Sequence, residues 1–235
     1  RKKITIDHTQ IPSTQNDFPV LISLPSDADL RSHAKTTGYD ILFTDANVDW
    51  TTGTRKDALD YEIEHYDAAT GALTAWVRIP TLSSETDTIL YMYYNCTICT
   101  TDRSNPVGVW SSSYYGVWHM NDQTISSISD STINHNNGTK ASGNNPLQTD
   151  GKIDGAQRFD GDDGIVIPSS DTMNPSFFTL EYWLKNTPPY TDTGMIRLTS
   201  RSDDSFDTAI DSNDNVSVYF YDSGDATWYD TGFDA

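Results

Sequence analysis

Short runs in which apolar and polar residues alternate dominate the first hundred positions of the chain. The clearest is LTAWVRIP, residues 73–80, in which every second side chain from Leu73 to Ile79 is apolar. A period of two is the pattern of a β-strand with one buried face. Comparable runs, separated by turn residues, predict strands at 3–8, 18–24, 39–45, 59–67, 73–80 and 88–94. Residues 26–34, SDADLRSHA, are the one stretch among them that favours a helical turn.

A second series of strand-like runs begins after a polar linker at residues 100–108. It predicts strands at 109–120, 155–161, 164–168, 178–186, 194–201, 207–212, 215–222 and 226–233. No segment in either half of the sequence carries the sustained 3.6-residue apolar stripe of a surface helix. The pattern therefore predicts an all-β protein with two β-sandwich domains, residues 1–103 and 104–235.

Composition narrows the classes of partner. The 235-residue chain has a formal net charge of −19, and all but four of its 34 acidic residues are Asp. Asp favours turns and hard-cation sites, whereas Glu favours helices, so the bias agrees with a loop-rich β protein. Strong negative charge repels nucleic acid and anionic membranes, so we expect neither as a partner. The sequence has no apolar run of about 18 residues, and we expect no membrane-spanning segment.

A polar stretch at residues 116–139, GVWHMNDQTISSISDSTINHNNGT, predicts a cation-binding loop. Hard cations such as Ca²⁺ take about six to eight oxygen ligands from carboxylates, amides and carbonyls. The stretch offers such oxygens from Asp122, Asp130, Asn134 and Asn136, the candidate ligands of a structural Ca²⁺. The alternative is an ordinary polar loop that ends in an Asn-Gly turn. One of two further acidic loops, residues 158–164 and 201–207, could complete the shell of the cation.

Two Glu residues raise the question of catalysis. Glu62 and Glu64 stand two apart in the predicted strand 59–67, so their side chains share one face. A paired-carboxylate glycosidase needs two carboxyl groups about 5–10 Å apart across a cleft. Nothing else in this half is typical of a sugar cleft, and we interpret the pair as a solvated strand face. His119, which follows a Trp, is interpreted as a packed histidine. The sequence therefore predicts no catalytic residue and no enzyme, with a glycoside hydrolase as the alternative.

Aromatic side chains are the other resource for binding, because sugars stack their apolar faces on Trp and Tyr. Trp50 lies in a polar stretch outside any strand pattern, and Trp228 lies in the stretch DATWYDTG. We name Trp50 and Trp228 as candidate ligand-binding residues. The remaining four fall in strand-like runs, and we expect them to pack in the core or between sheets: Trp76, Trp110, Trp118 and Trp183.

The sequence contains two cysteines, Cys96 and Cys99. One C-x-x-C pair cannot by itself complete a four-ligand zinc site. It also leads into a polar linker, whereas a thioredoxin-like motif needs a strand-to-helix setting. We therefore expect a local disulfide or two unreactive thiols.

Two resemblances cover nearly the whole chain. From Gly116 onward it resembles the laminin-G-like, concanavalin A-like jelly roll, on GVWHMND, DSTINHNNGT and GKIDGAQRFDGDDGIVIPSSDTMNPSFFTLEYWLKN. The first half is similar to the domain of unknown function DUF2341, on FPVLISL, GYDILFTDA, LDYEIEHYDAATGALTAWVRIP and TDTILYMYYN. It departs from that family in the longer stretch NVDWTTGTRKD and in NCTIC. The resemblances imply the fold, an extracellular setting and a structural Ca²⁺ in the jelly roll.

These observations predict an extracellular or cell-surface binding module, adhesive and carbohydrate-binding, with structural calcium. One alternative is a structural repeat or subunit of an extracellular filament, sheath or adhesin. Another is an accessory module of a secreted glycoside hydrolase. The last residues, YDTGFDA, follow a turn and contain no recognisable closing strand of a jelly roll. We therefore expect either that the native chain continues or that a donated strand closes the sheet, with self-association through open sheet edges.

Overall fold

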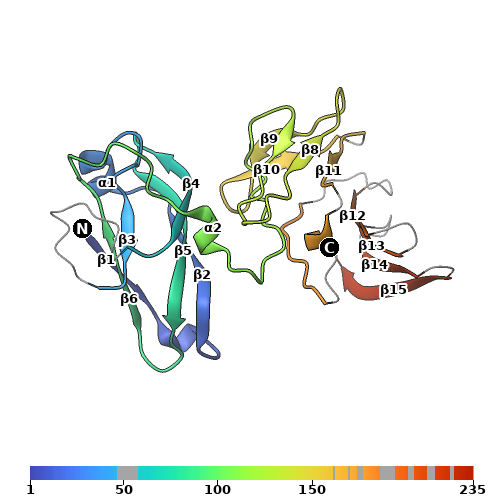
Figure 1. Cartoon of the computed structure of the whole chain (residues 1–235), viewed down its shortest axis with the longest axis horizontal. Helices are drawn as coiled ribbons and strands as arrows, with labels where there is room; N and C mark the ends of the chain where they lie inside the picture. Colours follow the sequence, from blue (N-terminus) through green and yellow to red (C-terminus); the bar gives the residue numbers. More distant parts are fainter. Residues whose placement is uncertain are drawn as a thin grey trace. The chain divides into compact units, whose positions relative to one another are not determined.

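The computed structural model describes residues 1–46, 58–160, 162–168, 170–173 and 177–185, together with the backbone of four strands between 194 and 234. Nearly all of the regular structure is antiparallel β-sheet (Figure 1), which confirms the all-β prediction. Contacts divide the chain into two units: residues 1–122, 129–135 and 148–156, and residues 123–128, 136–147 and 157–235. The first unit thus reaches beyond residue 103, and the division into domains 1–103 and 104–235 stays a prediction.

Two three-stranded antiparallel sheets build the first unit. One has the order β1 (Lys2–Ile6), β6 (Thr88–Tyr93), β3 (Leu42–Thr44), and the other β2 (Gln15–Leu24), β5 (Ala72–Leu82), β4 (Tyr61–Asp67). All six strands predicted for the first half are confirmed. A 3₁₀ turn, η1 (His8–Gln10), follows β1, and the helical turn predicted within 26–34 is α1 (Ala28–His33).

The core lies between these two sheets. The alternating residues of β5 are fully buried, as their period of two predicts: Leu73, Ala75, Val77 and Ile79. They belong to one hydrophobic cluster with Leu42 and Phe43 of β3, Leu90 and Met92 of β6, and Leu30 of α1. Full burial of one such aliphatic side chain contributes about 1.5–3 kcal/mol, so this cluster is the main source of stability for the sandwich. Among the residues that the structure describes, none after Tyr94 belongs to this cluster.

A close backbone approach fixes α1 beside the β4–β5 turn. Asp27 caps the helix, since its Oδ1 accepts from the N–H groups of Asp29 and Leu30, both at 3.0 Å. Gly71 has φ +72°, and a Cβ built on it would lie 2.0 Å from the carbonyl oxygen of Asp27. Only glycine fits there, because both the left-handed backbone and the contact exclude a side chain.

The chain continues into a short helix, α2 (Pro106–Val109), at the end of the predicted linker. Residues 110–122 contain no strand, so the prediction of a strand at 109–120 is wrong. The backbone of this stretch bonds to loop residues instead: the Val117 N–H donates to Asp130 Oδ1 at 2.9 Å. The Val117 carbonyl in turn accepts from the Ser131 N–H at 2.9 Å.

The second unit contains a sheet of order β11 (Ile165–Val166), β8 (Gly138–Lys140), β7 (Ser127–Ile128) and a 3₁₀ turn, η4 (Asp171–Met173). Its last part is an antiparallel meander of β12 (Gly194–Ser200), β13 (Asp204–Ile210), β14 (Asn215–Asp222) and β15 (Asp225–Asp234). A separate pair joins β9 (Leu147–Asp150) and β10 (Gly155–Arg158). Residues 177–185 carry no strand, so the strand expected at 178–186 is wrong over its described part.

Candidate functional site

Strand β4 places two carboxylates on the outer face of its sheet, the face turned away from the core. Glu62 lies opposite Trp76 of β5, and the register shifts after Ile63. Glu64 is the extra residue of a bulge, after which pairing resumes at His65. A bulge sets two neighbouring side chains against one residue of the partner strand and re-aims them. It thereby adds His65 to the face that already carries Glu62 and Glu64.

Both carboxylates accept hydrogen bonds from indole N–H groups. Trp76 Nε1 donates to Glu64 Oε2 at 2.8 Å, and Trp110 Nε1 donates to Glu62 Oε2 at 2.8 Å. The two indole rings pack against each other, with centroids 5.2 Å apart. Ser131 Oγ donates to the other oxygen of Glu62 at 2.6 Å. Each carboxylate is therefore held by a donor from an aromatic residue.

His119 lies between the two carboxylates. Its Nε2 is 3.1 Å from Glu62 Oε2, and its Nδ1 is 3.3 Å from Glu64 Oε2. The imidazole also packs on both indoles, with ring centroids 6.2 Å from Trp76 and 5.8 Å from Trp110. Ionised carboxylates only accept hydrogen bonds, so two such neighbours suit an imidazolium with both nitrogens protonated. Indole faces also attract a cation at this range.

We call these six residues the polar cluster: Glu62, Glu64, Trp76, Trp110, His119 and Ser131. Burial within it overturns the interpretation of a solvated strand face. The side chain of Glu62 is 12% exposed and that of Glu64 only 1%. The packed histidine predicted at His119 is confirmed, since its side chain is 11% exposed.

The environment shifts the pKa values of Glu62, Glu64 and His119 in different directions. Burial raises the pKa of Glu62, but hydrogen bonds and charge from His119, with bonds from Ser131 and Trp110, outweigh it and leave the pKa lowered. Burial dominates at Glu64 and keeps its pKa raised despite the charge of His119. Burial lowers the pKa of His119, yet the two Glu carboxylates and the charge of Asp122 raise it overall. The cluster therefore favours a bound proton.

The residues that cover this face follow β4 along its length. Asn105 donates from its backbone N–H to the Tyr61 carbonyl at 2.8 Å and from Nδ2 to Asp60 Oδ1 at 2.6 Å. Further on, Asn121 Nδ2 donates to the Glu64 carbonyl at 3.4 Å. We call residues 105–122 the covering segment. Its donors satisfy carbonyls on the edge of β4 that would otherwise be open to another strand.

The carboxyl groups of the polar cluster are enclosed by side chains of the same unit. A hydrolytic pair needs space for a sugar and a water between or beside its carboxyl groups. Here His119, Trp110 and Ser131 occupy the neighbourhood of Glu62, and Trp76 and His119 occupy that of Glu64. The arrangement is suited to fixing the covering segment on the sheet.

Comparison with protein families decides where the chain belongs. A family model described as a domain of unknown function, DUF2341, matches residues 38–163, more than half of the 235 residues. The chain belongs to the DUF2341 family. No curated protein and no solved structure matches it. The DUF2341 match contains every member of the polar cluster, but no family match supports the laminin-G-like jelly roll expected after Gly116.

Two of the predicted cation ligands, Asp122 and Asp130, accept hydrogen bonds from residues of the same polar stretch, 116–139. Asp122 Oδ1 accepts from the N–H and the hydroxyl of Ser129, at 3.1 and 2.9 Å. Asp130 is buried, and its carboxylate accepts from the Val117 N–H and from the N–H and hydroxyl of Thr132. These bonds hold the loop in shape, whether or not a cation is present.

The other two predicted ligands lie in different units. Asn134, in the first unit, donates from Nδ2 to the carbonyls of Tyr114 and Tyr115, both at 3.2 Å. Asn136, in the second, donates to Thr172 Oγ1 at 3.0 Å and accepts from Ser170 Oγ at 2.8 Å. The four residues do not form one described constellation, and calcium binding stays a prediction.

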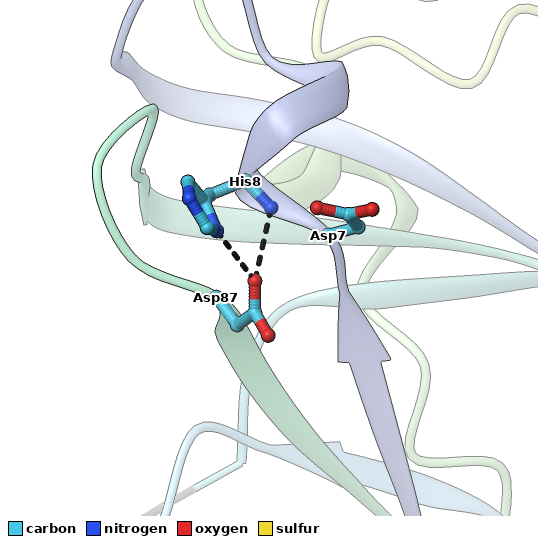
Figure 2. A group of neighbouring side chains, drawn as sticks. All are labelled: Asp7, His8 and Asp87. Carbon is cyan, nitrogen blue, oxygen red and sulfur yellow. Dashed lines mark hydrogen bonds and ion pairs between the residues drawn. The ribbon is translucent and has the colours of Figure 1, made fainter.

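A histidine flanked by two carboxylates lies where β1 meets η1. His8 Nδ1 is 2.7 Å from Asp87 Oδ1, and the His8 N–H donates to the same oxygen at 3.1 Å (Figure 2). Asp7 instead caps the turn, accepting from the N–H and hydroxyl of Thr9. Such a group has the donor types of a metal site. Asp7 caps η1, Asp87 binds His8, and these side chains are largely exposed, so the geometry indicates local structure.

The acidic loop 158–164 gathers three carboxylates, Asp160, Asp162 and Asp163, whose oxygens lie within 4.8 Å of one another. A hydrogen bond from Asp160 raises the pKa of Asp162, and the charges of Asp160 and Asp163 add to the effect. Asp163 Oδ2 also accepts from the Asp160 N–H at 2.9 Å. These carboxylates are largely exposed and repel one another.

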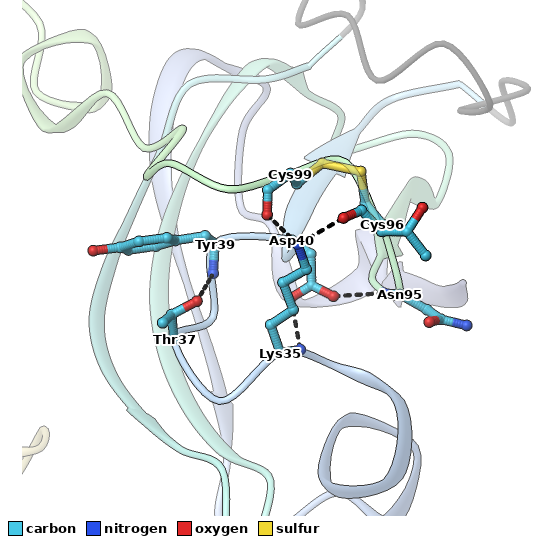
Figure 3. Close-up of a disulfide and its surroundings, with 8 residues drawn as sticks. Lys35, Thr37, Tyr39, Asp40, Asn95, Cys96 and Cys99 are labelled. Carbon is cyan, nitrogen blue, oxygen red and sulfur yellow. Dashed lines mark hydrogen bonds between the residues drawn. A yellow bond between two sulfur atoms is a disulfide. The ribbon is translucent and has the colours of Figure 1, made fainter.

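Cys96 and Cys99 form a disulfide, which confirms the local pairing expected from their spacing (Figure 3). Cys99 is buried, and its carbonyl accepts from Lys35 Nζ, which also donates to the Thr97 carbonyl at 3.1 Å. Asp40 joins the same two loops, accepting from the N–H groups of Lys35 and Asn95 at 2.9 and 2.8 Å (Figure 3). The disulfide thus closes a well-bonded turn after β6.

The predicted ligand-binding tryptophans fall largely outside the described structure. Trp50 lies in residues 47–57, which are not described, and Trp228 is described only as part of the backbone of β15, opposite Tyr219. Trp183 differs from expectation, because it is 70% exposed and not packed in a core. Phe177, in the same stretch, is 92% exposed. Residues 177–185 therefore present aromatic rings to solvent.

Sequence reasoning found the two Glu residues but missed their partners. Trp110, His119 and Ser131 are 48, 57 and 69 positions from Glu62, so no local pattern joins them to it. The available signal was the combination of two closely spaced Glu in an Asp-rich chain with a downstream His that directly follows a Trp.

Proposed function

We propose that this DUF2341 protein is an extracellular binding module without catalytic activity, and that carbohydrate is its ligand class. The observation that carries the proposal is the exposed aromatic run at residues 177–185. Phe177 and Trp183 are 92% and 70% exposed, and Tyr182 is also exposed. Isolated domains rarely present several large apolar side chains together unless the surface contacts a partner. Indole and phenol rings offer the flat faces on which sugars stack.

The disulfide supports the extracellular setting. Cys96 and Cys99 are joined, and disulfides persist in secreted and surface proteins but are rare in reducing compartments. The strong acidity of the chain, with its net charge of −19, suits a well-solvated extracellular surface.

The polar cluster supports a role without catalysis. Glu62 and Glu64 are the described carboxylates that most resemble a hydrolytic pair, yet both are covered by side chains of the same unit. A structural Ca²⁺ and a laminin-G-like jelly roll in the second part of the chain belong to the same proposal, on the strength of the sequence resemblance.

Glycan-array screening of residues 1–235, followed by calorimetry with the best ligand, tests the proposal. Trp183→Ala and Trp50→Ala should each weaken binding by about tenfold, the effect of losing about 1.4 kcal/mol of ring contact. Tyr39→Ala removes an exposed ring from the first unit and is the matched control, with affinity unchanged. Absence of glycan binding by the wild type, or equal losses in all three variants, would contradict a carbohydrate site.

A second candidate is a structural subunit that associates with copies of itself. The observation that favours it is the meander of the second unit, in which β12 and β15 each pair with a single described strand. Edge strands of this kind, β15 with 10 residues, present unpaired backbone groups that can template another chain. Sedimentation that shows mass rising with protein concentration, together with silent glycan arrays, would favour this function over carbohydrate binding.

A further inference from the structure

The covering segment is attached to its sheet through titratable groups. The carboxylates of Glu62 and Glu64 on β4 and the imidazole of His119 on the segment make the central contacts, at 3.1 and 3.3 Å. The hydrophobic core on the other face of the sheet contains no residue of the segment. Detachment of the segment would therefore break these polar contacts and expose the buried Val109 and Trp110 of the segment, while the main hydrophobic cluster stays intact.

We propose that the polar cluster is a proton-operated clamp, which holds the covering segment on the outer face of the sheet in mildly acidic solution and releases it as the solution becomes alkaline. The device is distinct from ligand binding and does not depend on it.

The direction of the pH effect follows from the charges of the groups that face His119. From β4 come Glu62 and Glu64, and from the segment itself comes Asp122, so the ring meets an excess of negative charge. The indole rings of Trp76 and Trp110, which pack against the imidazole, carry no charge and favour a cation through their π-systems. The imidazolium form is therefore the form that the docked segment requires.

The sign of the pH effect can be worked out for His119. Docking raises its pKa above the ordinary value of 6.5. A raised pKa contributes docking strength that is fully present below about pH 6.5, and this strength is lost as the pH rises through the docked pKa. Within that window the docking equilibrium weakens by at most about tenfold for each pH unit.

The two carboxylates act in opposite directions. The pKa of Glu62 is lowered by docking, so its contribution is present above its ordinary value of 4.5 and is lost as the pH falls through the docked pKa. Burial and the negative charges of Asp154 and Glu62 raise the pKa of Glu64, so its contribution is present below 4.5 and is lost as the pH rises through the docked pKa. The contributions of Glu62 and His119 are therefore both present between about pH 4.5 and pH 6.5, and above pH 4.5 Glu64 adds to the weakening of the clamp.

Hydrogen-exchange mass spectrometry of the full chain tests the clamp without requiring a variant. Protection of peptides from residues 109–122, corrected for intrinsic exchange, should fall by up to about tenfold for each pH unit above pH 6.5. Peptides from β5 serve as the internal control and should remain protected at pH 8.5, where those from 109–122 already exchange, because the hydrophobic core stays formed when the segment is released. Constant protection of 109–122, or protection of β5 that falls to the level of 109–122, would overturn the proposal.

His119→Gln provides the matched variant, since it keeps a hydrogen-bond donor but has no charge to lose. At pH 6 its covering segment should already show the low protection that the wild type reaches at pH 8.5, after correction for intrinsic exchange, with no further loss above pH 6.5. His8→Gln removes an exposed histidine that pairs with Asp87, outside the cluster, and should behave as the wild type. A loss of protection above pH 6.5 retained in His119→Gln would contradict the assignment. If His119→Gln does not fold, the wild-type comparison of 109–122 with β5 decides alone.

Discussion

Removal of the Glu62 carboxylate is the sharpest test of the polar cluster. In the structure this carboxylate accepts from Trp110 Nε1 at 2.8 Å, Ser131 Oγ at 2.6 Å and His119 Nε2 at 3.1 Å. Glu62→Ala would leave these three donors without their acceptor in a site where the Glu side chain is only 12% exposed. A solvated strand residue would have no such partners to lose.

The expected loss of unfolding free energy follows from the burial of the ion pair between Glu62 and His119. Removal of one partner from a buried ion pair costs about 3–5 kcal/mol, because the remaining charge loses its compensation. Since His119 keeps Glu64 as a second partner, we expect the lower end, about 3 kcal/mol, for Glu62→Ala. Glu62→Gln keeps the shape and one acceptor oxygen but loses the charge, and we expect about 2 kcal/mol.

Urea unfolding at pH 6, followed by tryptophan fluorescence, measures these changes as shifts of the midpoint at constant slope. Glu85→Gln is the matched control, since Glu85 is exposed in the turn between β5 and β6 and should change stability by no more than about 0.5 kcal/mol. A Glu62→Ala protein within about 1 kcal/mol of the wild type would refute the buried cluster and restore the solvated-strand interpretation. A lower slope would instead indicate that the covering segment is released before the core unfolds.

Further predictions concern the core, the turn glycine, the disulfide and calcium. Leu90→Ala should lower the free energy of unfolding by about 2–5 kcal/mol in the same urea assay, because Leu90 is fully buried. Gly71→Ala should lower it by more than about 1 kcal/mol, since the residue has φ +72° and a Cβ there meets a backbone oxygen at 2.0 Å. Replacement of Cys96 and Cys99 by Ser should cost about 2 kcal/mol, the loop-closure entropy of so short a ring, measured against the oxidised wild type. If Ca²⁺ binds, saturation at about 100 times Kd should add about 2.7 kcal/mol, which a melting curve with and without EDTA detects. Asp130→Ala should abolish that response, and a wild-type curve indifferent to EDTA would exclude the ion.

The sandwich of the first unit was predictable because its strands carry one buried face each. Alternation from Leu73 to Ile79 placed β5 and its inner face correctly, since every second residue is buried. The polar cluster was not predictable by the same means. The period-two pattern of a strand predicts that Glu62 and Glu64 share a face. Whether water or protein covers that face depends on residues 105–131, which are distant in sequence and return to contact it.

The wrong strands share a physical cause. Residues 109–120 and 178–186 are rich in aromatic and β-branched residues, and such composition measures how well side chains fit a pleated surface. It does not supply a partner strand. In 109–120 the rings of Trp110 and His119 instead donate to carboxylates, and the Val117 N–H is bound by Asp130, so the backbone has no need of a ladder.

The two faces of the β2-β5-β4 sheet are held by different forces, and this difference gives the clamp its physical basis. The inner face buries apolar side chains, whose attraction is non-directional and independent of pH. The outer face is held by buried Val109 and Trp110 and, in addition, by hydrogen bonds to Glu62 and Glu64, which depend on geometry and on protonation. Loss of the outer contacts therefore need not reach the core, because the hydrophobic cluster ends at Tyr94, before the covering segment begins. A sheet built in this way can keep its fold while the covering segment docks or is released as the pH changes.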